Sequence, residues 1–583
     1  MWKALKNNIY MLRFLAKCCP VYIMIILFQA LLSAISSVAN VYLFKYILDA
    51  LTNNYRINYI IKFILILFAF NLVYYAFNSI CTKILLPKYS QIIHKNIQID
   101  LFNRTSQMRF ELYDDAIFYN KFSFALQETE KRGFAVLNTF SKLICSLFSI
   151  IGFVLLIIGL EYRLVFVVIL GVFVTFLLNK SIVKIQHAFD VESIQPKREA
   201  QYISRVNYLK EYAQELKLYG FSALKELYIS ANNRLLCLIE SFGKKIAALT
   251  FFQNAISAIV STVSMIYLAM RVFSQTIPIS AYVMLNSCTI QLYSQINSLL
   301  NVINEIYEHS LYIGNIKGFL NDDELLQKYG DDKISNAVTS IKIINVSYRY
   351  ANSNYSNLLN ISLNIKLNEK IAIVGKNGAG KSTLLKLLAR IYDPTDGTIT
   401  MDGKDYREYC RSSFYSTISF QPQDFKLYSI NLAENILMRK VKNVEDEHLV
   451  VEALKFVGLY EKVFSYPENI YSVFTSEFSS RGIYLSNGEM QKLSLARAYA
   501  CKGCILLFDE PTSTLDVMAE AEYLNKLLQL EEKTILVVTH SIQNARRFNR
   551  IILMDKGQIV GDGTHEELLF SNEFYKRMLN ISK

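Results

Sequence analysis

A glycine-rich segment, Gly375-Lys-Asn-Gly-Ala-Gly380-Lys381-Ser382, has the composition and spacing of a phosphate-binding loop. It follows a β-branched run at residues 371–374 and precedes a helical pattern from Thr383, which is the setting that a P-loop requires. In such a loop Lys381 binds the β- and γ-phosphates, and the Ser382 hydroxyl ligates Mg²⁺. The remaining predicted ATP contacts are Gly375, Asn377, Gly378, Gly380 and Thr383. The alternative is a glycine-rich turn without a ligand.

Two adjacent carboxylates, Asp509 and Glu510, end an apolar run at residues 505–508. A buried strand of this kind would deliver Asp509 to the magnesium shell, through water. It would also place Glu510 to polarise a water for attack on the γ-phosphate. Paired carboxylates at a strand end are often plain helix N-caps, but the P-loop upstream and Pro511-Thr512 downstream favour the catalytic interpretation.

Five further motifs accompany these two. They are Tyr350 in Val346-Ser-Tyr-Arg-Tyr350, Gln423-Asp424, Leu485-Ser486-Asn487-Gly488-Glu489, Ser513-Thr-Leu-Asp516, and His540 after a β-branched run. In this order, the seven motifs resemble those of an ABC transporter half of the exporter type, with an N-terminal membrane domain fused to a C-terminal ATPase. Such halves include exporters of bacteriocins, lantibiotics and drugs, to which this chain is similar. With the membrane helices described below, the resemblance covers nearly the whole chain.

The resemblance implies a role for each motif. Tyr350 would stack on adenine, Asp516 would belong to the ATP-binding D-loop, and Gln423 would be a magnesium ligand. Lys381, Gln423, Glu510 and His540 would form the catalytic set. It also implies a head-to-tail dimer, in which each ATP lies between the P-loop of one subunit and Ser486 and Gly488 of the other. A lone histidine or tyrosine after a strand more often has a packing role, and only its place in the series favours function here.

Three departures from the family pattern lie within or just before the segment around Ser486. Asn487 replaces a usual glycine and Glu489 a usual glutamine, and Ser480 stands where these exporters often have an acidic residue. Asparagine tolerates unusual backbone angles, so we expect the turn to survive. Because the phosphate-facing and catalytic residues are kept, the sequence predicts two active ATP sites in a homodimer. The loss of acid at Ser480 puts the usual contact with the membrane domain in doubt.

All of these motifs lie in the C-terminal half of the chain, and the N-terminal half has a different composition. Residues 1–320 contain six long apolar stretches, which predict membrane helices at about 21–46, 60–84, 138–160, 163–181, 246–271 and 279–304. About 20 apolar residues cross the hydrocarbon core, and buried soluble helices are the alternative. The two longest connections and the N-terminal segment are rich in Lys and Arg. The positive-inside rule therefore places both termini in the cytoplasm. The resemblance to bacterial exporters implies that the bundle lies in the inner membrane of a bacterium.

The two long connections mix charged and apolar residues at helical spacing, with little Gly or Pro. We expect long cytoplasmic helical extensions, with hairpin tips near residues 113–121 and 218–225. From residue 321 a polar linker runs to 338, and short β-branched runs then alternate with helices over 339–583. The predicted fold class is an all-α six-helix membrane domain followed by an α/β P-loop ATPase domain.

Other candidate sites carry less weight. The Cys501-x-x-Cys504 spacing can bind zinc, but it has no second pair nearby and packing is the simpler interpretation. Along the predicted membrane helices the sequence offers neutral polar groups, which either line a substrate cavity or bond neighbouring helices. They are Asn71, Tyr74, Tyr75, Asn78, Gln253, Asn254, Asn286, Gln291, Tyr293, Gln295, Asn297 and Asn301.

The leading hypothesis is an ATP-driven homodimeric exporter of a small peptide or amphipathic compound that works by alternating access, with ATP and Mg²⁺ as cofactors. A lipid or multidrug exporter, a paired non-identical half, and a non-transporting sensor remain alternatives. The 583 residues are 52% hydrophobic with a formal net charge of +12. Basic cytoplasmic loops explain that charge, so no nucleic-acid partner is needed.

Overall fold

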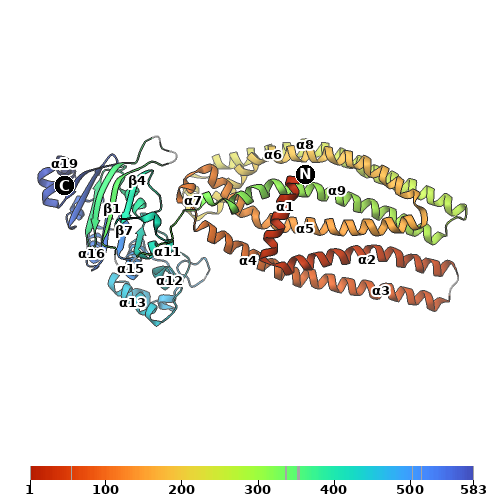
Figure 1. The fold of residues 1–583 in the computed structure, drawn as a ribbon, viewed down its shortest axis with the longest axis horizontal. Helices are drawn as coiled ribbons and strands as arrows, with labels where there is room; N and C mark the ends of the chain where they lie inside the picture. The colour runs from red at the N-terminus through yellow and green to blue at the C-terminus, as the bar shows by residue number, and fades with distance from the viewer. Residues whose placement is uncertain are drawn as a thin grey trace. The chain divides into compact units, whose positions relative to one another are not determined.

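The structure is a computed structural model that describes residues 2–53, 56–334, 338–350, 353, 355–478, 480–501, 503–513 and 515–581. It divides into two compact units. The helical unit comprises Met1–Thr105 and Lys121–Asp322, and the sheet unit comprises Ser106–Asn120 and Asp323–Lys583. Each unit is described by itself (Figure 1).

The helical unit consists of long helices joined by short turns. Its elements are α1 (Trp2–Cys18), α2 (Pro20–Thr52), α3 (Ile57–Ile80), a π-helical turn (Cys81–Leu85), α4 (Leu86–Thr105), α5 (Ala116–Glu161), α6 (Arg163–Tyr208), α7 (Lys210–Tyr219), α8 (Ser222–Phe273) and α9 (Ile279–Asn321). The helices α5, α6, α8 and α9 extend well beyond the predicted apolar spans, as their mixed charged and apolar ends require. The amphipathic helix α1 was not anticipated as an element.

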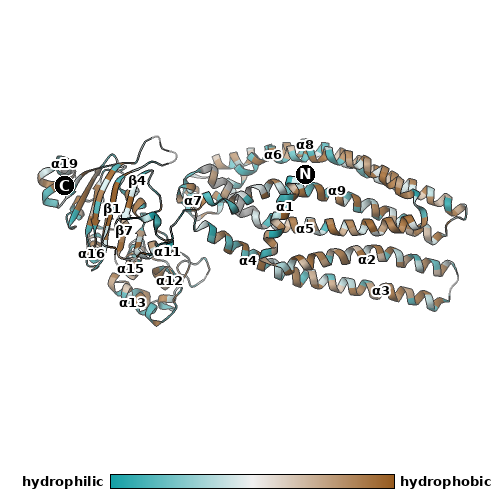
Figure 2. Ribbon diagram, viewed as in Figure 1, coloured by the Kyte–Doolittle hydropathy of each residue, from teal (hydrophilic) through white to brown (hydrophobic). Residues whose placement is uncertain are grey.

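Five of the described helices are long and apolar enough to cross a membrane. They are α2, the continuous helix Ile57–Thr105, Lys131–Glu161 within α5, α6 and α8. Figure 2 colours these helices as largely hydrophobic along their length, and α3 has no buried residue within the chain. The helix α9 has the length but not the hydropathy, because Asn286, Gln291 and Gln295 interrupt its apolar stretch. Its passage through the membrane therefore stays a prediction.

Polar side chains join α2 to α3 inside the predicted membrane layer. The Nδ2 group of Asn71 donates to Oδ1 of Asn40 at 2.9 Å, and Nε2 of Gln29 donates to Oδ1 of Asn78 at 2.7 Å. In hydrocarbon an unsatisfied amide is costly, so these pairs fix the register of the two helices. Asn71 and Asn78 thus have the interhelical role that the sequence left open.

The sheet unit contains two sheets. A four-stranded antiparallel sheet has the order β2-β1-β4-β5, and a six-stranded sheet has the order β10-β9-β3-β8-β7-β6. The strands are β1 (Ser340–Tyr348), β2 (Leu358–Lys366), β3 (Lys370–Gly375), β4 (Asp396–Met401), β5 (Lys404–Asp405), β6 (Ile418–Gln421), β7 (Ile505–Asp509), β8 (Thr534–Val538), β9 (Arg550–Asp555) and β10 (Gln558–Gly563). All neighbours from β9 to β6 are parallel, and only the edge strand β10 is antiparallel. The α/β class predicted from the β-branched runs is confirmed.

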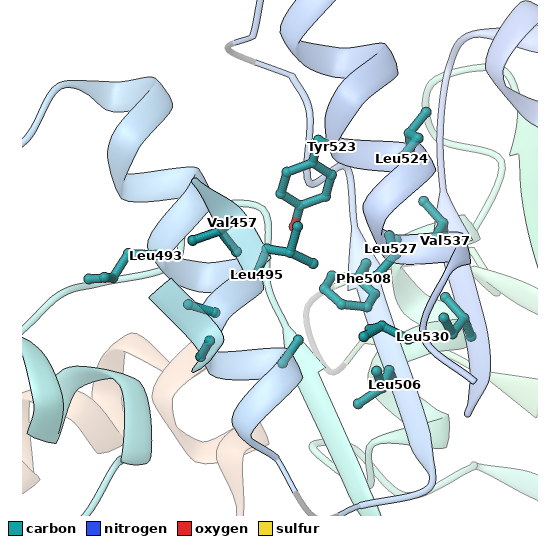
Figure 3. Close-up of a cluster of buried hydrophobic side chains, with 14 of the residues drawn as sticks. Val457, Leu493, Leu495, Leu506, Phe508, Tyr523, Leu524, Leu527, Leu530 and Val537 are labelled. Carbon is teal, nitrogen blue, oxygen red and sulfur yellow. The ribbon is translucent and has the colours of Figure 1, made fainter. Parts of the chain in front are cut away.

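Helices cover this sheet and bury its apolar strands. They are α10 (Lys381–Leu388), α11 (Arg411–Thr417), α12 (Leu432–Leu437), α13 (Val444–Val457), α14 (Tyr460–Phe464), α15 (Asn487–Ala500), α16 (Val517–Leu528), α17 (Ile542–Ala545), α18 (His565–Ser571) and α19 (Glu573–Ile581). Every residue of β7 and β8 is buried, as expected for central parallel strands. Figure 3 shows Leu506 and Phe508 of β7 packed with Leu524 and Leu527 of α16.

The predicted linker at 321–338 is more structured than its polar composition suggested. Residues Asp323–Leu325 form a 3-10 turn, Leu326 pairs with Met108, and Asp332 pairs with Tyr409 as isolated bridges. Residues 335–337 lie outside the described residues. Backbone hydrogen bonds to distant residues order this segment, and the polarity of its side chains gives no sign of such bonds.

Candidate functional site

The carboxyl ends of the parallel strands bring the predicted ATP residues to one edge of the sheet. Lys381 and Ser382 follow β3, Gln423 follows β6, Asp509 ends β7, and His540 follows β8. Ligands of open α/β sheets bind at this edge, because the loops that leave the strands converge there.

Close packing and left-handed backbone fix the shape of the P-loop. A Cβ on Gly375 would lie 2.2 Å from the carbonyl oxygen of Met554 in β9. Gly380 has φ +95°, and a Cβ there would lie 2.7 Å from the carbonyl oxygen of Asn357. Gly378, at φ +77°, has open space around it, and Asn377 is exposed. The loop is thus open on the side of Asn377 and Gly378, where backbone N–H groups can meet phosphate.

The ammonium group of Lys381 is buried beneath this loop. Its Nζ donates to the carbonyl oxygens of Gly375 and Lys376, at 2.9 Å in each case. Burial lowers the pKa of Lys381, and the carboxylates of Glu510 and Asp509 oppose that shift. Two neutral carbonyl oxygens therefore hold the lysine at the loop. A bound phosphate can take their place, because its charged oxygens accept stronger hydrogen bonds from the ammonium group.

Ser382 and Asp509 form a pair suited to a hard cation. The Ser382 hydroxyl donates to Oδ1 of Asp509 at 2.9 Å, and Asp509 is 3% exposed. Burial raises the pKa of Asp509, the charge of Glu510 adds to the rise, and the hydrogen bond from Ser382 opposes it. A buried carboxylate beside a hydroxyl, both oxygen donors, fits Mg²⁺.

Glu510 is held by the two other predicted catalytic residues. Nε2 of Gln423 donates to its Oε2 at 3.0 Å, and Nε2 of His540 contacts its Oε1. The backbone of Glu510 is left-handed, at φ +47°, and its N–H donates to the carbonyl of Val538 at the end of β8. This strained turn aims the carboxylate away from the strand. The structure therefore brings together Gln423, Glu510 and His540.

Tyr350 stands in an aromatic cluster next to the start of α10. Its ring makes edge contacts with Tyr348 (centroids 5.0 Å apart) and with Tyr392 (5.3 Å). Its hydroxyl lies 3.3 Å from Oγ1 of the buried Thr383. Thr383 is therefore placed to support Tyr350.

Ser486 and Glu489 form a capping box at the start of α15. The backbone N–H of Ser486 donates to the Glu489 carboxylate at 2.9 Å, and the N–H of Glu489 donates to Oγ of Ser486 at 3.4 Å. Lys462 also pairs with Glu489. Burial opposes ionisation of Glu489, but these hydrogen bonds outweigh it and lower its pKa. Glu489 in place of glutamine thus keeps the reciprocal cap, which either residue can make.

We expected Asn487 to be accepted because asparagine tolerates unusual backbone angles, but its backbone angles are not unusual. It is the first residue of α15 and is absent from the positive-φ positions. A side chain is accommodated at this position because the helix begins there. The turn is intact, as expected, but the reason that we gave for it was wrong. Gly488 follows, and a Cβ there would lie 3.4 Å from Leu515.

We expect Glu489→Ala to destabilise the sheet unit by about 1 kcal/mol through loss of the cap. Glu489→Gln should cost less than about 0.5 kcal/mol, because glutamine keeps the box and loses only the exposed ion pair with Lys462. Thermal unfolding of both variants measures this difference. Equal losses in the two variants would contradict it.

The remaining predicted residues lie at the N-termini of α15 and α16. Among the described residues, no hydrogen bond joins Ser486 or Gly488 to the P-loop. Asp516 caps α16 by accepting from the N–H of Ala519 at 2.8 Å, which is the plain structural role. Thr514, within the Ser513–Asp516 motif, and Ser479, next to Ser480, lie outside the described residues. Ser480 itself is exposed.

Sequence reasoning missed Tyr392 and its partners. Phe110 packs edge-on against the Tyr392 ring (5.5 Å), and the Tyr392 hydroxyl donates to Oδ2 of Asp114 at 2.8 Å. The turn that carries Phe110 and Asp114, near the first expected hairpin tip, therefore belongs to the sheet unit. An isolated tyrosine after α10 gives no signal in the sequence.

Comparisons with known proteins agree with this geometry. Residues 358–513 match the ABC transporter family. This segment is therefore an ABC transporter ATP-binding domain. The chain is 27% identical over 508 residues to the nisin transport ATP-binding protein of Lactococcus lactis, which covers 84% of this chain and 82% of that protein. It is 33% identical over 282 residues to the subtilin transport ATP-binding protein of Bacillus subtilis, over 48% of this chain and 46% of that one.

A solved structure of a bacterial Atm1-family ABC exporter with ATP bound has the same fold. The TM-score is 0.80 at 20% identity, over 96% of this chain and 98% of that one. Fused membrane and ATPase parts, expected from the motifs, are thereby confirmed. The chain thus carries an ABC transporter ATP-binding domain and several helices apolar enough to span a membrane, in the fold of an ABC exporter.

Proposed function

We propose that this ABC transporter half forms a homodimer that exports a small peptide or amphipathic compound from a bacterial cytoplasm. The observation that carries the ATP-driven part is the placement of Glu510 between Gln423 and His540, at the same sheet edge as Lys381. In this proposal both termini are cytoplasmic, and the bundle spans the inner membrane as six helices.

In the ATP site, each side chain acts on a defined part of the nucleotide. Lys381 exchanges its two carbonyl acceptors for β- and γ-phosphate oxygens, and Tyr350 stacks on the adenine. Glu510 accepts a proton from the attacking water, and Gln423 and His540 keep its two oxygens in place. Mg²⁺, when bound at Ser382, Gln423 and (through water) Asp509, supplies charge neutralisation to the phosphates.

The second half of each ATP site comes from the partner subunit. Ser486 and Gly488 stand at the N-terminus of α15, where backbone N–H groups and the helix dipole favour an anion. Among the described residues neither is hydrogen-bonded to the P-loop of its own chain, as a head-to-tail pair requires, in which ATP charge bridges two surfaces. Asp516 would act in the same interface while capping α16.

A polar cavity between α8 and α9 supports an amphipathic cargo. It has a volume of about 320 Å³ and is lined by both polar and apolar residues, which are Asn254, Ser257, Ser261, Thr289 and Tyr293 with Ala258, Val260 and Ile290. The Tyr293 hydroxyl is buried and has no partner within the described residues. A wall that mixes neutral polar groups with apolar ones suits a molecule with both characters better than an ion. The transported peptides in the names of two relatives favour a peptide.

The test is ATP-dependent flux in proteoliposomes with outward-facing ATPase domains. We expect uptake of an amphipathic cationic peptide, which Lys381→Ala abolishes. Uptake of a fluorescent lipid or drug without peptide uptake would favour the lipid or multidrug alternative. ATPase activity with no flux of any of these would instead favour a sensor.

A further inference from the structure

One face of α1 carries only positive charge. The helix contains four basic residues and no aspartate or glutamate. Its exposed residues are Trp2, Lys3, Lys6, Ile9, Arg13 and Lys17. Positions 2, 6, 9, 13 and 17 recur at helical spacing and therefore form one stripe, which Lys3 flanks. We call these six residues the α1 stripe.

The opposite face of α1 is locked to α9, so the stripe has a fixed direction. Nδ2 of Asn7 donates to the carbonyl (3.1 Å) and hydroxyl (3.0 Å) oxygens of Ser310. Nδ2 of Asn8 donates to the carbonyl oxygen of Ile306 at 2.8 Å. Met11 and Leu15 on the same face are fully buried. Rotation that turned the stripe inward would break these bonds.

The direction of α1 places the stripe along a membrane surface. Extended backbone at Cys19 (φ −160°, ψ 92°) separates α1 from α2, whose apolar span begins directly afterwards. In Figure 1, α1 runs across the long axis of α2, α3 and α9. A helix that lies across the point where the next helix enters the apolar layer is interfacial, and Trp, Lys and Arg are typical of that layer.

We infer that the α1 stripe binds the headgroups of anionic phospholipids in the leaflet that α2 enters. No described carboxylate forms an ion pair with Lys3, Lys6 or Arg13. Lys17 is different, because it lines a pocket of about 270 Å³ together with Asp100 of α4. These three cations, which have no carboxylate partner among the described residues, match anionic phosphodiester groups. The neighbouring Trp2 is 83% exposed and of a residue type that favours the headgroup layer.

The experiment uses Trp2 as its own reporter, because it is the only tryptophan of the 583 residues. The full chain in lipid nanodiscs is excited where tyrosine does not absorb. Quenching of Trp2 by brominated phosphatidylglycerol is compared with quenching by brominated phosphatidylcholine at equal mole fraction. We expect quenching by the anionic lipid to be about twofold stronger or more at low salt, because three surface cations enrich anionic lipid around them.

Two triple variants test whether the cations of the α1 stripe cause this preference for anionic lipid. Lys3→Gln/Lys6→Gln/Arg13→Gln should remove the preference, whereas Lys217→Gln/Lys225→Gln/Lys556→Gln, with the same change of charge at other exposed positions, should keep it. Equal quenching by the two lipids in the native chain would overturn the inference, and so would a preference that survives in the first variant. Weak quenching by both lipids would also overturn it, because Trp2 would then face water or a second copy of the chain.

Discussion

Replacing Glu510 by glutamine is expected to lower kcat for ATP hydrolysis by about 100-fold or more, with ATP binding retained. Glutamine is isosteric with glutamate and can still meet Gln423 and His540, but it cannot accept the proton of the attacking water. Positioned general bases contribute 10²- to 10⁴-fold, which sets the expected size. Steady-state ATPase assays in lipid, with Mg²⁺ present, measure the loss.

The controls for this variant separate chemistry from folding. Glu531→Gln changes an exposed glutamate of the same unit and should leave the rate unchanged. The nucleotide affinity and the thermal midpoint of Glu510→Gln should match those of the native chain, because the amide has the same size and shape as the carboxylate that it replaces. An unchanged rate in Glu510→Gln would show that another group takes the proton, and Glu510 would lose its proposed role.

Much of the fold was predictable because its signals are local. Apolar runs of membrane length and buried strands such as β7 each occupy one continuous stretch, so composition alone reveals them. The P-loop is equally local, since its glycines, Lys381 and Ser382 are neighbours in sequence. Where polar residues dilute the apolar run, as Asn286 and Gln291 do in α9, the same signal weakens.

The remaining features depend on partners that are distant in sequence. The lock between α1 and α9 joins Asn8 to Ile306, and the packing of Tyr392 involves Phe110. No short-range pattern announces such pairs. The order of the motifs identified Gln423 and His540 as candidates, but it could not predict that their side chains contact Glu510. Their contact with Glu510 follows from the strand order, which places β6 and β8 on either side of β7.

Replacing Lys381 by alanine is expected to weaken ATP binding by about 100-fold, which corresponds to about 2.7 kcal/mol. A hydrogen bond to a charged group contributes roughly 1.5–3 kcal/mol, and the ammonium would serve phosphate oxygens in a loop whose other donors are neutral N–H groups. Calorimetric titration with a non-hydrolysable ATP analogue measures the loss. Lys556→Ala, at an exposed position of the same unit, is the matched control.

The stability of the Lys381→Ala variant distinguishes a ligand-binding lysine from a structural one. Nζ has two backbone acceptors at 2.9 Å, so a purely structural role predicts that their loss lowers the thermal midpoint clearly. Burial of an ammonium among neutral acceptors is itself unfavourable, as the lowered pKa of Lys381 indicates. Removing it relieves that cost, and the two contributions should nearly cancel. We therefore expect a small change in midpoint beside a large loss of affinity, and the reverse pattern would assign Lys381 to folding rather than to ATP.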